Sequence, residues 1–186
     1  ADCSLREAIA AANSAATDDV IEFDPSVFNV ARVITLGGSE LSINSSGSLV
    51  VNGTGSNQLS ISGNNASRVF FVNVNATVSI NSLKITQGNV GFGSGGGLRN
   101  DGTLLLNNLE ISGNSTGDIG GGLFNNAATL TVINSVLSGN SVVNCGGGIY
   151  NFRGTVTFSN STISGNSAFA GAGICTSNGV FNLNYS

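Results

Sequence analysis

The chain has 186 residues, of which 40% are hydrophobic, 9% are charged and 27 are glycine, and it contains no His, Met or Trp. This composition excludes simple disorder, because disordered chains combine low hydrophobicity with high net charge. The formal net charge of −4 provides no basic surface, so we expect neither nucleic acid nor an anionic membrane as a partner. No apolar run is long enough to span a bilayer.

The first residues predict a capping helix. Ser4 and Glu7 have the S-x-x-E spacing of a capping box. Apolar residues follow at the i, i+3, i+4 and i+7 positions of one helical face, at Leu5, Ala8, Ile9 and Ala12. Because an open solenoid exposes its last core layer, we expect residues 1–16 to cover the first turn.

An acidic group follows the helix, at Asp18, Asp19, Glu22 and Asp24. Clustered carboxylates are ligands that calcium prefers, so this group is the one candidate for a calcium site. The alternative, which we favour, is an edge strand around residues 20–23 with an exposed acidic side.

A repeat with a period of roughly 25 occupies the rest of the chain, and self-similarity of this period is typical of solenoids. Glycine-led segments end at Leu98, Leu123, Ile149 and Ile174, and the intervals between them are nearly equal. A second marker recurs at constant intervals, at Thr77, Thr103, Thr129 and Thr155. We therefore expect one domain over residues 1–186, with irregular first turns over 17–70 and regular repeats over 71–186.

Each repeat carries three short stretches in which apolar and polar residues alternate, and period two indicates strands. Glycine and Asn corners separate them, and the frequent glycines exclude a helical repeat. The predicted fold is all-β: a right-handed parallel β-helix of about six turns with three strands per turn and a short N-terminal capping α-helix. The carboxyl end stops in mid-repeat, so either the natural protein continues, which we favour, or something else covers that end.

Stacking the turns aligns like residues in columns. The expected inward columns are Phe71/Leu98/Leu123/Ile149/Ile174, Val78/Leu104/Leu130/Val156/Phe181, Ile80/Leu106/Val132/Phe158/Leu183 and Ile85/Ile111/Leu137/Ile163. Three sets of corner residues also align, and we expect them to form amide ladders along the axis: Asn108/Asn134/Asn160, Asn114/Asn140/Asn166 and Asn100/Asn125/Asn151. These Asn residues resemble ligand-binding clusters, but we interpret them as structural.

One outward face carries aromatic and charged residues. Arg99, Phe124, Tyr150 and Cys175 fall in one outward column. Asp101, Phe152 and Arg153 lie nearby in the sequence. Such a face can stack on sugar rings or contact another protein. The alternative, which we favour, is cross-strand packing that stabilises the sheet.

A second outward stripe consists of the repeated threonines, and regular Thr-x-Thr rows resemble the surface of ice-binding β-helices. Ser79 and Leu105 interrupt the second row. Threonine also has a high β-propensity, so we favour an ordinary strand surface.

The absence of His excludes His-based acid–base catalysis and the usual nucleophile triads. Glu110 is expected beside Lys84 one turn away, which makes a solvated ion pair and not a metal cage. The interval between Cys145 and Cys175 is longer than one repeat, so they do not stack. A disulfide between them requires the glycine corner to fold back, and the spacing leaves this open.

The opening run from Cys3 to Ile9, with Ala12-Asn13 and residues 19–23 (DVIEF) after it, resembles the start of the CSLREA-domain family. The later G-G-G-I-x-N and S-x-I-S-G-N units look like the parallel β-helix repeats of the pectate-lyase-like superfamily. The resemblance implies a secreted or surface-exposed bacterial protein. Family members usually carry more sequence, often another Cys, before this motif, which implies that Cys3 has lost a partner here. The resemblance supplies no catalytic residues.

The leading functional hypothesis is therefore a non-enzymatic extracellular scaffold, such as an adhesin stalk or a filament subunit on the bacterial cell surface. We expect no cofactor apart from a possible calcium ion, and the expected partners are further copies of the chain or extracellular glycans. The alternative is a polysaccharide-binding or lyase-like polysaccharide-degrading protein that uses the aromatic face. Ice binding is a minor alternative.

Overall fold

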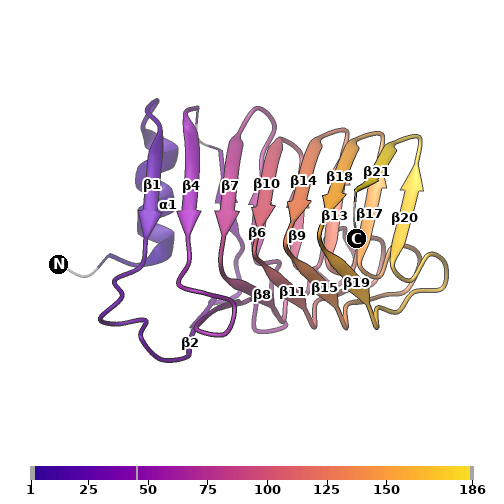
Figure 1. Cartoon of the computed structure of the whole chain (residues 1–186), viewed down its shortest axis with the longest axis horizontal. Helices are drawn as coiled ribbons and strands as arrows, with labels where there is room; N and C mark the ends of the chain where they lie inside the picture. Colours follow the sequence, from indigo (N-terminus) through magenta and orange to yellow (C-terminus); the bar gives the residue numbers. More distant parts are fainter. Residues whose placement is uncertain (1–2, 45, 185–186) are drawn as a thin grey trace.

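The computed structural model describes residues 3–44 and 46–184 and shows a parallel β-solenoid with one helix at its N-terminal end (Figure 1). Three sheets run along the solenoid, and every pair of neighbouring strands in them is parallel. The predicted fold class, all-β with three strands per turn and about six turns, is confirmed.

Sheet A has seven strands: β1 (Asp19–Glu22), β4 (Ser48–Asn52), β7 (Thr77–Asn81), β10 (Thr103–Asn107), β14 (Thr129–Ile133), β18 (Thr155–Ser159) and β21 (Val180–Asn184). Sheet B has six: β2 (Arg32–Thr35), β5 (Leu59–Ser62), β8 (Lys84–Thr86), β11 (Glu110–Ser112), β15 (Val136–Ser138) and β19 (Thr162–Ser164). Sheet C also has six: β3 (Leu41–Ile43), β6 (Phe70–Val72), β9 (Leu98–Asn100), β13 (Leu123–Asn126), β17 (Ile149–Phe152) and β20 (Ile174–Ser177). Two further strands, β12 (Ser115–Thr116) and β16 (Ser141–Val142), pair in the corner between sheets B and C, and the sequence did not predict them.

The chain visits sheets A, B and C in that order in each turn, as Figure 1 shows. The first turns are longer than the later ones. Asp19 pairs with Leu49 and Ser48 pairs with Thr77, and both intervals exceed the one between the paired residues Thr77 and Thr103. The strand register thus explains why the period is clear only in the later part of the sequence.

The core consists of stacked apolar columns that face the inside of all three sheets. Three of the four predicted inward columns have the predicted register. In the fourth the assignment of Phe71 is wrong, because Phe70 pairs with Leu98 and is fully buried. Phe71 pairs with Arg99 on the outer face. A one-residue slip reverses the direction of every side chain in a strand, and residues 63–69 lack the glycine triplet that fixes the register in later turns.

Two of the three predicted Asn ladders are continuous amide chains inside the corners. Nδ2 of Asn114 donates to Oδ1 of Asn140 at 2.9 Å, and Nδ2 of Asn140 donates to Oδ1 of Asn166 at 3.0 Å. Nδ2 of Asn100 donates to Oδ1 of Asn125 at 2.7 Å, and Asn125 donates in the same way to Asn151. Asn100, Asn125, Asn140 and Asn151 are fully buried. These amides satisfy backbone groups at corners that water cannot reach.

The third set, Asn108, Asn134 and Asn160, is not an amide ladder. These residues have φ angles of 58°, 52° and 47°, in the left-handed region that Asn tolerates better than most residues. Nδ2 of Asn108 donates to Ser82 Oγ, and Nδ2 of Asn134 donates to Asn107 Oδ1. The repeat of Asn at this corner therefore reflects backbone conformation and not stacking of side chains.

The predicted cap is helix α1 (Leu5–Ser14), which lies at the N-terminal end of the solenoid against β1 and β3. The capping box is present: the backbone N–H of Ser4 donates to Glu7 Oε2 at 2.8 Å, and the N–H of Glu7 donates to Ser4 Oγ at 3.3 Å. Leu5, Ile9 and Ala12 are buried beneath it. The helix is shorter than the predicted range 1–16, of which residues 1 and 2 lie outside the described residues.

We predict that Asn140→Ala lowers the free energy of unfolding by about 3 kcal/mol, because it leaves two donors of Asn114 and the Ile111 carbonyl without their partner. Urea denaturation measures the change. Asn134→Gly serves as the matched control, since glycine adopts a positive φ freely, and it should change the free energy by less than about 1 kcal/mol. Equal effects of the two substitutions would contradict the distinction between ladder and corner.

Candidate functional site

The outer face of sheet C holds the predicted aromatic and charged residues. Strand pairing places Phe71, Arg99, Phe124 and Tyr150 in one column across β6, β9, β13 and β17, and we call them the aromatic–arginine column. Cys175 on β20 continues the column beyond Tyr150, as predicted. Phe71 belongs to this column and not to the core, where the repeat had suggested it would lie.

The column packs against itself. The Arg99 guanidinium lies between two rings, 5.4 Å from the Phe71 centroid and 5.5 Å from the Phe124 centroid. The rings of Phe124 and Tyr150 are 5.8 Å apart. Phe124 is only 5% exposed. The rings thus serve cross-strand packing, with cation–π contacts on both faces of the guanidinium.

Asp101 fixes the orientation of Arg99. Its carboxylate accepts hydrogen bonds from Nε of Arg99 at 2.9 Å and from Nη2 at 2.8 Å. Oδ1 of Asp101 also accepts from Asn126, its neighbour in the next turn. This bidentate geometry is the strongest form of an arginine–carboxylate pair. The pair fixes the guanidinium between the two rings.

Phe152 and Arg153 lie beyond the column at the end of β17. Phe152 pairs with Asn126 on the outer face, and the Arg153 guanidinium lies 4.8 Å from the Phe152 ring centroid. Arg153 itself has a φ of 56° at an exposed corner. Five of the six predicted residues therefore share the outer face of sheet C, and Arg153 lies at its corner.

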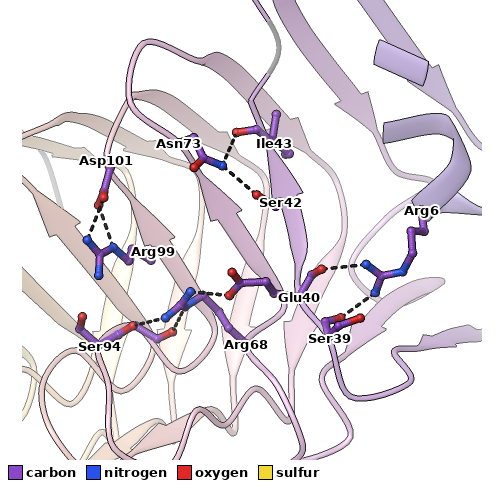
Figure 2. A network of polar contacts seen from close by, with 11 residues as sticks. Arg6, Ser39, Glu40, Ser42, Ile43, Arg68, Asn73, Ser94, Arg99 and Asp101 are labelled. Carbon is purple, nitrogen blue, oxygen red and sulfur yellow. Dashed lines mark hydrogen bonds and ion pairs between the residues drawn. The ribbon is translucent and has the colours of Figure 1, made fainter. Parts of the chain in front are cut away.

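Arg68 is the residue that sequence reasoning missed. Figure 2 shows its guanidinium between Glu40 and the loop that carries Ser94. It forms an ion pair with Glu40, donates to the Ser94 and Gly95 carbonyls at 2.9 Å, and lies 5.6 Å from the Phe71 ring. Its side chain is 11% exposed. Burial lowers the pKa of the Arg68 guanidinium, and the Glu40 carboxylate opposes that change.

Arg68 borders a recess of about 540 Å³ in the corner between sheets B and C. Three loops of unequal length form it, at residues 36–40, 63–69 and 87–97. On the other side of Glu40, Arg6 of the cap donates to the carbonyls of Ser39 and Glu40 at 2.6 and 2.8 Å (Figure 2). Arg6 thus connects the cap to the first turn. Arg68, in the second turn, connects the first turn to the third.

The predicted acidic group does not converge. The described residues contain no cluster of three or more His, Cys, Asp or Glu that could hold a metal ion. Asp18 accepts hydrogen bonds from the backbone N–H of Ser48 at 2.9 Å and from its hydroxyl at 2.8 Å, and these bonds lower the pKa of Asp18. Asp24 accepts the equivalent pair from Ser26 within its own turn.

Strand β1 is the predicted edge strand, but its acidic side is only partly exposed. Glu22 points outward, whereas Asp19 pairs with Leu49 at a position that faces the core. The exposed position between them belongs to Val20. Asp19 and Val20 therefore have the opposite orientations to those that alternation predicts, whereas Ile21 faces the core and Glu22 faces outward as expected.

Cys145 and Cys175 form a disulfide between consecutive turns, which answers the question that their spacing left open. Their Cα atoms are 6.0 Å apart, a usual distance for such a bond. Gly146 follows Cys145 with a φ of 75°, and the equivalent Gly120 and Gly171 also have positive φ angles. Cys3 is exposed and forms no disulfide with another described residue.

The threonine row lies on the outer face of sheet A. Thr77, Thr103, Thr129 and Thr155 pair in direct succession and are all exposed. The neighbouring row contains Leu105, as the sequence indicated. Only the first row is therefore uniform.

No protein-family model matches the chain, and neither a curated protein nor a solved structure matches it significantly. Among the described residues, no helix has both the length and the apolar character that crossing a membrane requires.

We predict that calcium does not stabilise the chain. Asp18 and Asp24 each accept hydrogen bonds from a serine, and the described residues contain no cluster of side chains that could hold a metal ion. Millimolar calcium, compared with EDTA, should shift the melting temperature by less than about 1 °C, measured by differential scanning calorimetry. Magnesium serves as the control for ionic strength. A calcium-specific increase of several degrees would restore the calcium site.

Proposed function

We propose that the protein is a non-enzymatic extracellular scaffold, a rigid rod that holds or spaces other parts of a surface structure. The observation that carries the proposal is the continuity of the pairing. Each of the three sheets runs without a break from the first turns to the last, and two amide ladders run inside the corners. Because each turn contacts only its neighbours, such a structure extends along one axis as a rod.

The charged residues support the same proposal, because most of their interactions are structural. Arg99 is fixed by Asp101, and Arg68 by Glu40 and two carbonyls. Glu110 accepts from Lys84 at 2.7 Å and from Ser112 at 2.8 Å. A catalytic acid or base needs access to a substrate proton, and these side chains are committed to their neighbours.

The disulfide supports an extracellular location, because such bonds persist in oxidising compartments. The resemblance of the opening motif to the CSLREA-domain family points the same way, to a secreted or surface-exposed bacterial protein. Low charge and a polar surface of Asn, Ser, Thr and Gly suit a protein that presents a passive surface.

The first test is a search for activity on glycans. We expect the purified chain to release no products from anionic or neutral polysaccharides, with or without calcium, in reducing-end and ultraviolet absorbance assays. Product formation above the buffer blank would overturn the scaffold proposal.

A second candidate function, glycan binding, is favoured by the Tyr150 ring, which is the last ring of the aromatic–arginine column and is partly exposed. If this face binds sugars, Tyr150→Ala abolishes retention on a polysaccharide affinity gel. Thr103→Ala on sheet A is the matched control, because Thr103 lies on a different outer face. Retention that is equal in both variants would exclude this face.

The disulfide gives a prediction for the stability of the rod. Replacing both Cys145 and Cys175 by Ser should lower the free energy of unfolding by about 3 kcal/mol, because the bond closes a segment with a sequence separation of 30. Urea denaturation measures the loss, and Cys3→Ser is the control. An unchanged urea midpoint in the double variant would show that the disulfide does not stabilise the last turns.

A further inference from the structure

The corner between sheets B and C changes shape along the solenoid. The loops in this corner span residues 36–40 and 63–69 in the first two turns. In the next four turns they span 87–97, 113–122, 139–148 and 165–173. These longer loops include the pair β12 and β16 and extend their pairing through isolated bridges. We call these four longer loops the shelf.

Three apolar side chains on this shelf are largely exposed to solvent. Phe92 is 99% exposed, Val143 is 65% exposed and Phe169 is 94% exposed. Gly91 and Gly93 flank Phe92, and Ala168 and Ala170 flank Phe169. Fully exposed phenylalanines do not contribute to the core, and apolar groups gathered on one side of a protein mark contact surfaces.

The three side chains form a row. Asn89, Ser115, Ser141 and Ser167 are bridge partners in successive turns, so the residues two positions further on, Gly91, Gly117, Val143 and Phe169, also follow one another. The Gly117 N–H donates to Gly91 O at 2.6 Å, and the Phe169 N–H donates to Val143 O at 3.2 Å.

Phe92 completes the row at its first end. A Cβ on Gly117 would lie 3.5 Å from Cδ1 of Phe92, so the ring lies beside Gly117. We call Phe92, Val143 and Phe169 the apolar ridge. It extends over three turn spacings, which is about 14 Å at about 4.8 Å per turn.

The shelf loops are nearly uncharged, and the two charged side chains beside the first of them, Arg68 and Glu40, form an ion pair with each other. Asp118 is the one charged residue in the four shelf loops 87–97, 113–122, 139–148 and 165–173. Its carboxylate accepts a hydrogen bond from Nδ2 of Asn144 at 3.2 Å. The shelf loops therefore offer few charged side chains for ion pairs with a strongly charged partner. An uncharged apolar surface can bind here without the cost of removing water from charged groups.

A second copy of the ridge fits this surface. The row has a ring at each end and Gly117 and Val143 between them. Rotation by half a turn about an axis between the turns of Gly117 and Val143 places Phe92 against Phe169 of the other copy. The row is therefore self-complementary in the antiparallel sense that an isologous interface requires.

The area of the ridge suits a weak interface. Two phenylalanines of about 200 Å² each and a valine of about 100 Å² give roughly 500 Å² per copy, or about 1,000 Å² in total. That value assumes complete burial of the three side chains and lies below the roughly 1,200 Å² at which stable interfaces begin, so the expected association is weak and reversible.

We propose that the chain associates side by side in antiparallel pairs through the apolar ridge. The proposal goes beyond the scaffold function, because a scaffold needs no partner copy. Lateral pairing leaves both ends of each solenoid free.

Sedimentation velocity from 1 to 200 µM tests the proposal on the chain as it is. The wild-type protein should show a concentration-dependent dimer. Phe92→Ser with Phe169→Ser should weaken dimerisation at least tenfold, with an unchanged melting temperature because neither ring is in the core. Val74→Ser is the matched control, since Val74 is 66% exposed in the corner between sheets C and A, and it should dimerise like the wild type.

Two outcomes would overturn the proposal. One is a wild-type chain that stays monomeric over the whole range. The other is a dimer that survives in the Phe92→Ser, Phe169→Ser variant, since association would then use another surface, such as the ends of the solenoid.

Cross-linking tests the orientation in a Cys3→Ser background. The antiparallel arrangement predicts a disulfide-linked dimer when Phe92→Cys and Phe169→Cys chains are mixed and oxidised, and little in either chain alone. A parallel arrangement gives the reverse result and would refute the antiparallel pair.

Discussion

The structure depends on the stacking of each residue on its equivalent one turn away. A parallel ladder satisfies the backbone of each strand through the strands above and below it, so a turn has no stability of its own. The constant register from Thr77 through Thr103 and Thr129 to Thr155 aligns the apolar columns and the Asn ladders at the same time. A shift of one residue in any strand would move a core column to the surface.

The sequence predicted the regular part of the fold because that part is periodic. Where periodicity was weak, the prediction was wrong: Phe71 was assigned to the core because two phenylalanines are adjacent and no glycine triplet marks the corner before them. The Asn108 set was assigned to a ladder because recurrence alone does not distinguish an amide chain from a left-handed backbone.

The candidate site was predictable only in part, for a related reason. The outward column of Arg99, Phe124 and Tyr150 follows from the repeat, and so its residues were found. Arg68, which borders the recess, is not repeated, and its partners Glu40 and Ser94 lie in the preceding and following turns, in loops of unequal length. The disulfide and the apolar ridge likewise depend on loop paths that composition and spacing do not fix.

The two amide ladders have a direction. Each side chain donates its Nδ2 hydrogen to the Asn of the following turn, from Asn100 through Asn125 to Asn151 and from Asn114 through Asn140 to Asn166. Hydrogen bonds in such a chain polarise one another in the same sense, so the corners are electrically polar along the axis. The middle residue of each ladder, Asn125 or Asn140, accepts a hydrogen bond from the preceding turn and donates one to the following turn. Duplication of a turn that carries both ladder positions would leave this pattern intact, so the ladders allow the regular part of the rod to lengthen without redesign of its interior.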